Sequence, residues 1–113
     1  MTAVVHLVEQ TFDEALATSE GVWMVDFWAA WCAPCRAIAP VLEQLALASK
    51  GGVTLAKVNV DEEPALAARY GICSIPTILF VKDGKVVDQA IGAVPKAQIQ
   101  AKLAALGAVA VES

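Results

Sequence analysis

Short apolar runs alternate along this chain with longer segments in which apolar residues recur at helical spacing. This pattern predicts strands that alternate with helices. The apolar runs predict strands, in chain order, at residues 4–8, 22–28, 53–60, 78–81 and 86–91. A first helix is expected to follow residue 11, and the periodic segments predict further helices at residues 34–49, 64–70 and 95–106.

Capping residues indicate where these helices begin and end. Thr11 is followed three residues later by Glu14, the spacing of a capping box, so Thr11 is the expected N-cap of the first helix. Pro64 occupies a first-turn position, where proline is tolerated. Glycines are expected to end two helices, in the KGG sequence at 50–52 and at Gly107.

Pro40 lies inside the second predicted helix. An internal proline removes one backbone hydrogen bond and clashes with the preceding turn. We therefore expect a kink near residues 37–41, and the alternative is that Pro40 divides two separate helices.

The last two strands are joined by the sequence KDGK at 82–85. Asp-Gly between two apolar runs is a strong signal for a hairpin, so the sheet is expected to become antiparallel there. The expected fold class is α/β, with a central mixed sheet covered by helices on both faces in three layers. One domain is expected over residues 1–113, with residues 108–113 as a short tail.

Composition and charge narrow the class of protein. Of 113 residues, 58% are hydrophobic and 18% charged, enough for one core. Charged residues interrupt every apolar segment before it reaches the roughly 18–20 residues of a membrane-spanning helix, and the N-terminus lacks the basic region of a signal peptide. The net charge of −4 comes without a Lys/Arg cluster for phosphates. We expect a soluble cytoplasmic protein with neither a membrane nor a nucleic-acid partner.

The candidate chemistry lies in the cysteines, of which the chain has three. Cys32 and Cys35 form a C-x-x-C pair where a predicted strand turns into a predicted helix. At a helix N-terminus, free N–H groups and the helix dipole favour a thiolate, which is the form that attacks disulfides. Cys32 is therefore the expected nucleophile, and Cys35, one turn later, is expected to be more buried and less reactive. Pro34 lacks an N–H group, so it is expected to moderate the acidity of Cys32.

A zinc half-site is the alternative explanation of the C-x-x-C pair. The soft ligands available are Cys32, Cys35, Cys73 and His6. A zinc site usually has its second pair at a similarly short spacing, whereas Cys73 and His6 are far apart in the sequence. We therefore expect no metal and no role for His6.

A single acidic residue, Asp26, lies within the apolar strand at 22–28. Burial makes a carboxylate costly to ionise, so its pKa is expected to rise and it can exchange protons with Cys35. The alternative is a solvated carboxylate at the end of the strand.

The sequence WCAPC at 31–35 resembles the active-site motif of the thioredoxin family, in which the common form is WCGPC. The sequences DFW at 26–28 and IPT at 75–77, together with Lys57, also match, and the resemblance extends over about residues 4–106. It implies the thioredoxin fold, with Cys32 as the attacking and Cys35 as the resolving thiol. It further implies that Asp26 lies beneath Cys35 and is assisted by Lys57, and that Pro76 is a cis-proline facing the pair.

The resemblance also implies an exposed apolar surface that binds an extended substrate chain mainly through its backbone. The expected substrate-binding residues are Trp31, Ala33, Pro34, Ile75, Pro76 and Gly92. Ala33 departs from the usual Gly and adds a methyl group to this surface. Cys73 lies outside the family's general pattern and is either buried as a small hydrophobe or exposed beside partners. Trp28 fits a core position as well as a functional one.

The leading interpretation is a thiol-disulfide oxidoreductase that reduces disulfides of protein substrates through Cys32 and Cys35. By resemblance, a thioredoxin reductase recycles it. We also expect no cofactor and a monomer. A disulfide oxidase or isomerase on the same fold is the second interpretation, and a non-catalytic binding subunit is the third. Pro34 and the absence of a signal peptide argue against the second.

Overall fold

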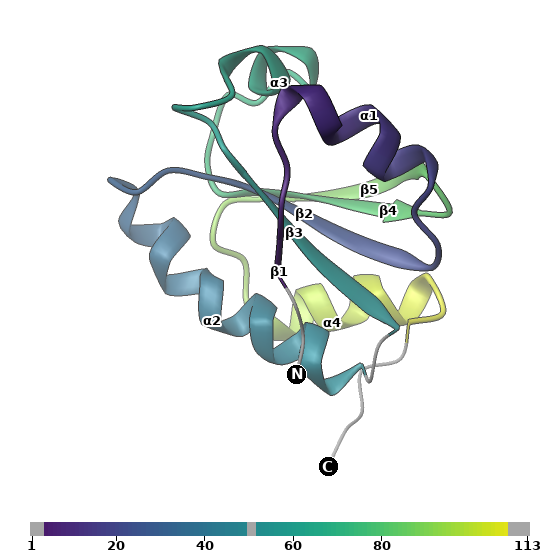
Figure 1. Cartoon of the computed structure of the whole chain (residues 1–113). Coiled ribbons are helices and arrows are strands. Elements are labelled where there is room, and N and C mark those ends of the chain that lie inside the picture. The colour runs from purple at the N-terminus through teal and green to yellow at the C-terminus, as the bar shows by residue number, and fades with distance from the viewer. Residues whose placement is uncertain (1–3, 50–51, 109–113) are drawn as a thin grey trace.

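The computed structural model describes residues 4–49 and 52–108. Strands and helices alternate until a hairpin and a last helix close the chain (Figure 1). The elements are β1 (Val4–His6), α1 (Glu9–Ala17), β2 (Val22–Trp28), α2 (Ala33–Ala48), β3 (Val53–Asn59), α3 (Pro64–Arg69), β4 (Thr77–Lys82), β5 (Lys85–Ile91) and α4 (Lys96–Ala105). The α/β class expected from the sequence is confirmed.

The five strands form one mixed sheet in the order β1-β3-β2-β4-β5. The strands β1, β3 and β2 are parallel, whereas β4 pairs with β2 and β5 with β4 in antiparallel fashion. The sheet already changes direction at β4, before the predicted turn, because β4 runs antiparallel to β2. The turn itself reverses the chain between β4 and β5, and Asp83 and Gly84 there have positive φ angles of 50° and 87°. This is the backbone that a two-residue hairpin needs, and it explains the Asp-Gly sequence.

Helices cover both faces of the sheet, with α1 and α3 on one face and α2 and α4 on the other (Figure 1). Successive strand residues point to opposite faces, and β2 supplies both cores. Met24 packs with the apolar residues of α2 and α4, whereas Val25 and Phe27 pack with those of α1 and α3. Because Asp26 is two residues from Met24, its carboxyl group faces α2, the helix that carries the cysteines.

The start of α1 differs from the expectation. The N-cap is Val8, not Thr11, and the strand predicted to reach residue 8 ends at His6. Thr11 is the third residue of the helix, and its hydroxyl accepts a hydrogen bond from the Val8 N–H at 3.4 Å. The Glu9 N–H is bonded at 3.0 Å by the Glu63 carboxylate from a distant loop. The cap is thus partly supplied by tertiary structure, which a local capping pattern does not reveal.

Two further expectations concern helix ends. Pro40 lies inside one continuous helix, so the alternative that it divides two helices is wrong, and the kink stays a prediction. Ala108 is 7% exposed and packs with the core beneath α2 and α4, so it does not belong to a loose tail. Residues 109–113, and the lysine and first glycine of the KGG sequence, lie outside the described residues. No helix of the described residues is long and apolar enough to cross a membrane.

Candidate active site

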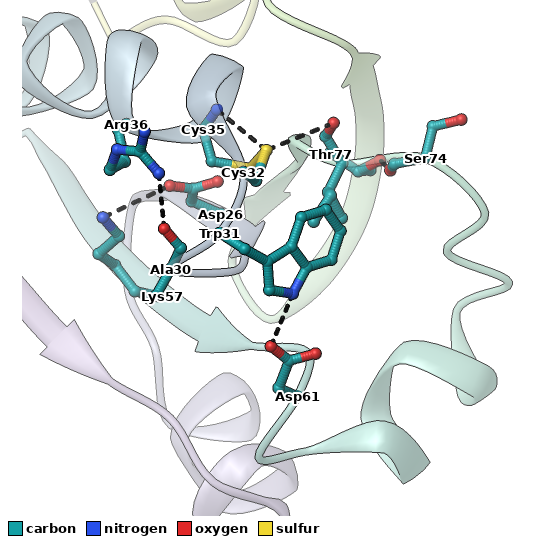
Figure 2. Close-up of a disulfide and its surroundings, with 11 residues drawn as sticks. Asp26, Ala30, Trp31, Cys32, Cys35, Arg36, Lys57, Asp61, Ser74 and Thr77 are labelled. Carbon is teal, nitrogen blue, oxygen red and sulfur yellow. Dashed lines mark hydrogen bonds and ion pairs between the residues drawn. A yellow bond between two sulfur atoms is a disulfide. The ribbon is translucent and has the colours of Figure 1, made fainter.

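Cys32 and Cys35 form a disulfide at the start of α2 (Figure 2). Cys32 is the N-cap residue, as predicted, with an extended backbone at φ −90° and ψ 106°. Its Cα lies 5.2 Å from that of Cys35, within the usual range for a disulfide. The change from strand to helix therefore places the two sulfur atoms within bonding reach.

The surroundings of Cys32 favour a thiolate when the disulfide is reduced. The Cys35 N–H points at Cys32 Sγ with a distance of 3.1 Å. Pro34 occupies the second helical position and offers no N–H group. A hydrogen bond to the charged form of a thiol lowers its pKa. The Cys35 N–H can make such a bond, whereas Pro34 cannot. Cys32 and Cys35 are 4% and 2% exposed, so the expected difference in burial is small.

The loop before β4 closes the other side of the disulfide. Its Ile75–Pro76 peptide bond is cis, as expected, and the Ile75 carbonyl oxygen lies 3.9 Å from Cys32 Sγ. The loop is held by two hydrogen bonds, from the Gly92 N–H to the Pro76 carbonyl at 2.8 Å and from the Thr77 hydroxyl to the Ser74 carbonyl at 2.6 Å. Of the predicted residues, Ile75 therefore contacts the disulfide, and Pro76 and Gly92 belong to the backbone that holds this loop.

Asp26 is fully buried, so the alternative of a solvated strand-end carboxylate is wrong. Burial raises the pKa of Asp26 to about 6, and the nearby positive charge of Lys57 limits the rise. The Lys57 ammonium lies 3.7 Å from Asp26 Oδ2, an ion pair longer than a hydrogen bond (Figure 2). Both residues face α2, because they are register neighbours in β2 and β3.

Trp31 is the most exposed large apolar side chain beside the disulfide, at 68%. Its indole N–H donates to Asp61 Oδ2 at 2.8 Å (Figure 2). Next to it lies a shallow groove of about 200 Å³, lined by Trp31, Val60, Ala67, Ile72, Cys73 and Ile75. Of the predicted substrate-binding residues, Trp31 and Ile75 line this groove. Pro76, which is buried, and Gly92, which is half-buried, do not. Ala33 and Pro34 are exposed in the first turn of α2.

Two contacts near the disulfide were missed by the sequence reasoning. The first is Asp61, and the second is Arg36, whose guanidinium donates to the Ala30 carbonyl at 2.6 Å. A signal for Asp61 did exist, since Trp31 follows β2 and Asp61 follows the parallel neighbour β3. The carboxyl ends of parallel neighbours lie at the same edge of a sheet. The Arg36 contact had no such signal.

The remaining candidate zinc ligands are Cys73 and His6. Cys73 is a free, exposed thiol, so the alternative of burial as a small hydrophobe is wrong. His6 is exposed on the edge strand β1. Within the part of the chain that the structure describes, no group of three or more His, Cys, Asp or Glu residues could hold a metal ion. Cys32 and Cys35 are instead bonded to each other.

Comparison with known proteins agrees with this geometry. A family model described as Thioredoxin matches residues 3–105. Thioredoxin 2 of Chlorobaculum tepidum is 53% identical over 95 residues, which are 84% of this chain and 87% of that protein. Thioredoxin of Alicyclobacillus acidocaldarius is 49% identical over 102 residues, 90% of this chain and 96% of that protein. The chloroplastic M-type thioredoxin of Pisum sativum is 48% identical over 95 residues, 84% of this chain and 55% of that protein.

The pair Cys32–Cys35 has the chemistry of a dithiol that exchanges with other disulfides, since it is already bonded and begins a helix. The relatives span most of the chain, and so does the family model. On both grounds the protein belongs to the thioredoxin family of disulfide oxidoreductases.

Proposed function

We propose that the protein reduces disulfides of protein substrates and is recycled by a thioredoxin reductase. The observation that carries this proposal is the position of Cys32, at the N-cap of α2 and across from the loop that holds Ile75. A substrate chain in the adjoining groove would bring its disulfide to Cys32 Sγ. We also propose that the protein is a monomer and that it acts in the cytoplasm. The bacterial relatives support the proposed location.

The exchange proceeds in two displacements. The Cys32 thiolate attacks one sulfur of the substrate disulfide, a mixed disulfide forms, and the other substrate sulfur leaves as a thiolate and takes up a proton. The Cys35 thiolate then attacks Cys32 Sγ and releases the second substrate sulfur. The substrate gains two electrons and two protons, and the Cys32–Cys35 disulfide holds the oxidation until the reductase returns two electrons.

Asp26 is the group that we assign to proton transfer in the second displacement. A carboxylate with a pKa of about 6 is mostly ionised at neutral pH and can still accept a proton. It lies on the face of β2 that α2 covers, so it is directed toward Cys35 (Figure 2). The Lys57 ammonium stabilises the ionised form of Asp26.

The proposed function is tested by reduction of a model protein disulfide with and without a thioredoxin reductase and its reductant. We expect turnover only when the reductase system is complete. The redox potential of the Cys32–Cys35 pair is measured in parallel against glutathione. A potential in the range of oxidases, with net oxidation of a reduced substrate, would contradict the proposal.

Trp31→Ala is expected to lower kcat/KM for a protein disulfide by about tenfold, because an exposed anchor of the groove is lost. Reduction of a small aromatic disulfide is expected to change much less, since it does not fill the groove. Leu47→Ala is the matched control, because Leu47 is 54% exposed on α2 but does not line the groove. An equal loss with both substrates would show that Trp31 acts on the disulfide and not on partner binding.

Cys73 is expected to be dispensable for turnover but sensitive to oxidation. It is exposed and lines the groove, so a glutathione adduct there would obstruct substrates. After treatment with glutathione disulfide, mass spectrometry is expected to find the adduct on Cys73, with lowered activity that Cys73→Ser does not show. An unmodified Cys73 in protein whose other thiols have reacted, or a Cys73→Ser variant that is inactive when reduced, would contradict this.

A further inference from the structure

The Lys57 ammonium lies close to two side chains of β2. It lies 3.7 Å from Asp26 Oδ2 and 4.9 Å from the centre of the Trp28 ring. The Lys57 side chain is only 12% exposed, so much of its hydration is lost. A lysine has a long flexible stem that usually carries its ammonium to water. A specific interaction is therefore needed to keep the Lys57 ammonium beside the buried carboxyl group of Asp26.

The sheet places the three side chains on one face. Asp26 and Trp28 are two residues apart on β2, so they point to the same side. Lys57 is the register neighbour of Asp26 on β3. Trp28 also packs against the cluster formed by Ala29, Cys32 and Cys35. One ring thus contacts both the region of the disulfide and the lysine.

The Trp28 ring is used here by its face. The indole Nε1 is buried and has no hydrogen-bond partner among the described residues, so the N–H group does not explain why a tryptophan is present. The face of an indole carries negative charge and attracts a cation more strongly than other aromatic rings do, above all when the cation is desolvated. The arrangement fits a ring that retains an ammonium.

We propose that Trp28 is a positioning residue that holds the Lys57 ammonium next to Asp26. The inference rests on the proposed role of Asp26 as proton acceptor for Cys35. Without the ring, the ammonium would turn toward solvent and leave the carboxylate unsupported. The carboxylate would then be less ionised near neutral pH, and resolution of the mixed disulfide would slow.

Other charges around Asp26 do not take the place of Lys57. On β4 its register neighbour is the apolar Ile78. On α2 the nearby cation is Arg36, which is exposed and donates to the Ala30 carbonyl (Figure 2). Lys57 is the charged group that acts on the pKa of Asp26. The coupling between Trp28 and Asp26 should therefore pass through Lys57.

The test is a double-mutant cycle in which NMR measures the pKa of Asp26 in each variant. It uses the oxidised protein, in which the disulfide cysteines do not titrate. Lys57→Met is expected to raise the pKa of Asp26 by about one pH unit when Trp28 is present. In the Trp28→Leu background the same change is expected to have at most about half that effect. Trp28→Phe is expected to lie between, because its ring is a weaker cation acceptor.

A shape-preserving control separates the ring's charge from its bulk. Tetrafluorotryptophan at position 28 keeps the size of the ring but removes the negative charge of its face. It is expected to weaken the Lys57 effect as Trp28→Leu does, while the protein stays folded. An unchanged Lys57 effect with this residue or with Trp28→Phe and Trp28→Leu would overturn the proposal and leave Trp28 as a packing residue.

The rate of mixed-disulfide resolution against pH gives the functional readout. Trp28 variants are expected to shift the lower limb of this profile in the direction in which Lys57→Met shifts it. If Asp26→Asn resolves at the normal rate while the pKa coupling persists, the proton-transfer role fails but the positioning of Lys57 stands. If Asp26→Asn slows resolution but the Trp28 variants leave the effect of Lys57 on the pKa of Asp26 unchanged, the proton-transfer role stands and the positioning of Lys57 by Trp28 fails.

Discussion

Cys32→Ser is expected to abolish turnover of protein disulfides, by a factor of about 10³ or more, because the nucleophile is removed. Cys35→Ser is expected to lose turnover as well, but to retain the first displacement. Its Cys32 keeps the N-cap position and attacks, yet the second thiol that releases the substrate is missing. The variant should therefore accumulate as a mixed disulfide with its substrate.

Non-reducing electrophoresis and mass spectrometry measure this difference. Both variants are mixed with a protein disulfide, quenched with acid, and examined for a covalent adduct that a reductant releases. The double variant Cys32→Ser/Cys35→Ser controls for adducts on the exposed Cys73. Trapping by Cys32→Ser with none by Cys35→Ser would reverse the two assignments.

Asp26→Ala is expected to make the oxidised protein more stable near neutral pH, by about 1–3 kcal/mol. Burial raises the pKa of Asp26 from 3.8 to about 6 in the folded protein. The folded state therefore binds the proton more tightly than the unfolded state between these two values. The contribution of this proton to the free energy of unfolding is fully present below pH 3.8 and is lost as the pH rises through about 6. Two pH units correspond to about 3 kcal/mol, from which the cavity left by the carboxyl group subtracts.

The free energy of unfolding against pH, from denaturant titrations, measures this effect. The wild-type curve is expected to fall between about pH 4 and 6.5 by more than the Asp26→Ala curve does. Asp88→Ala serves as the control, because a backbone N–H of Gln89 and then Lys102 lower the pKa of that exposed carboxyl, so its contribution has the opposite sign. Asp26→Ala is also expected to slow resolution of the mixed disulfide near neutral pH. Parallel curves for wild type and Asp26→Ala, with unchanged kinetics, would refute the assignment.

The fold was predictable because its signals are local. Apolar runs, helical spacing and the Asp-Gly turn depend on near neighbours in the chain, and each of them predicted an element that the structure contains. The error at Thr11 has the same origin. The start of α1 is decided partly by Glu63, which lies 54 residues away and binds the Glu9 N–H. No pattern within the first helix carries that information.

The amino-acid sequence by itself determined that a C-x-x-C pair begins a helix and that one acidic residue lies within the apolar strand before it. Both follow from short-range order, since hydrophobic spacing sets the strand and the helix on either side of Cys32. Only the tertiary structure decided what surrounds these groups. The Asp61 bond to Trp31 and the placing of Lys57 over Trp28 depend on which strands are neighbours. The exposure of Cys73 depends on how the loop between α3 and β4 lies on the fold. Such contacts form between residues far apart in the chain, so their distances and pKa effects arise only when the sheet is assembled.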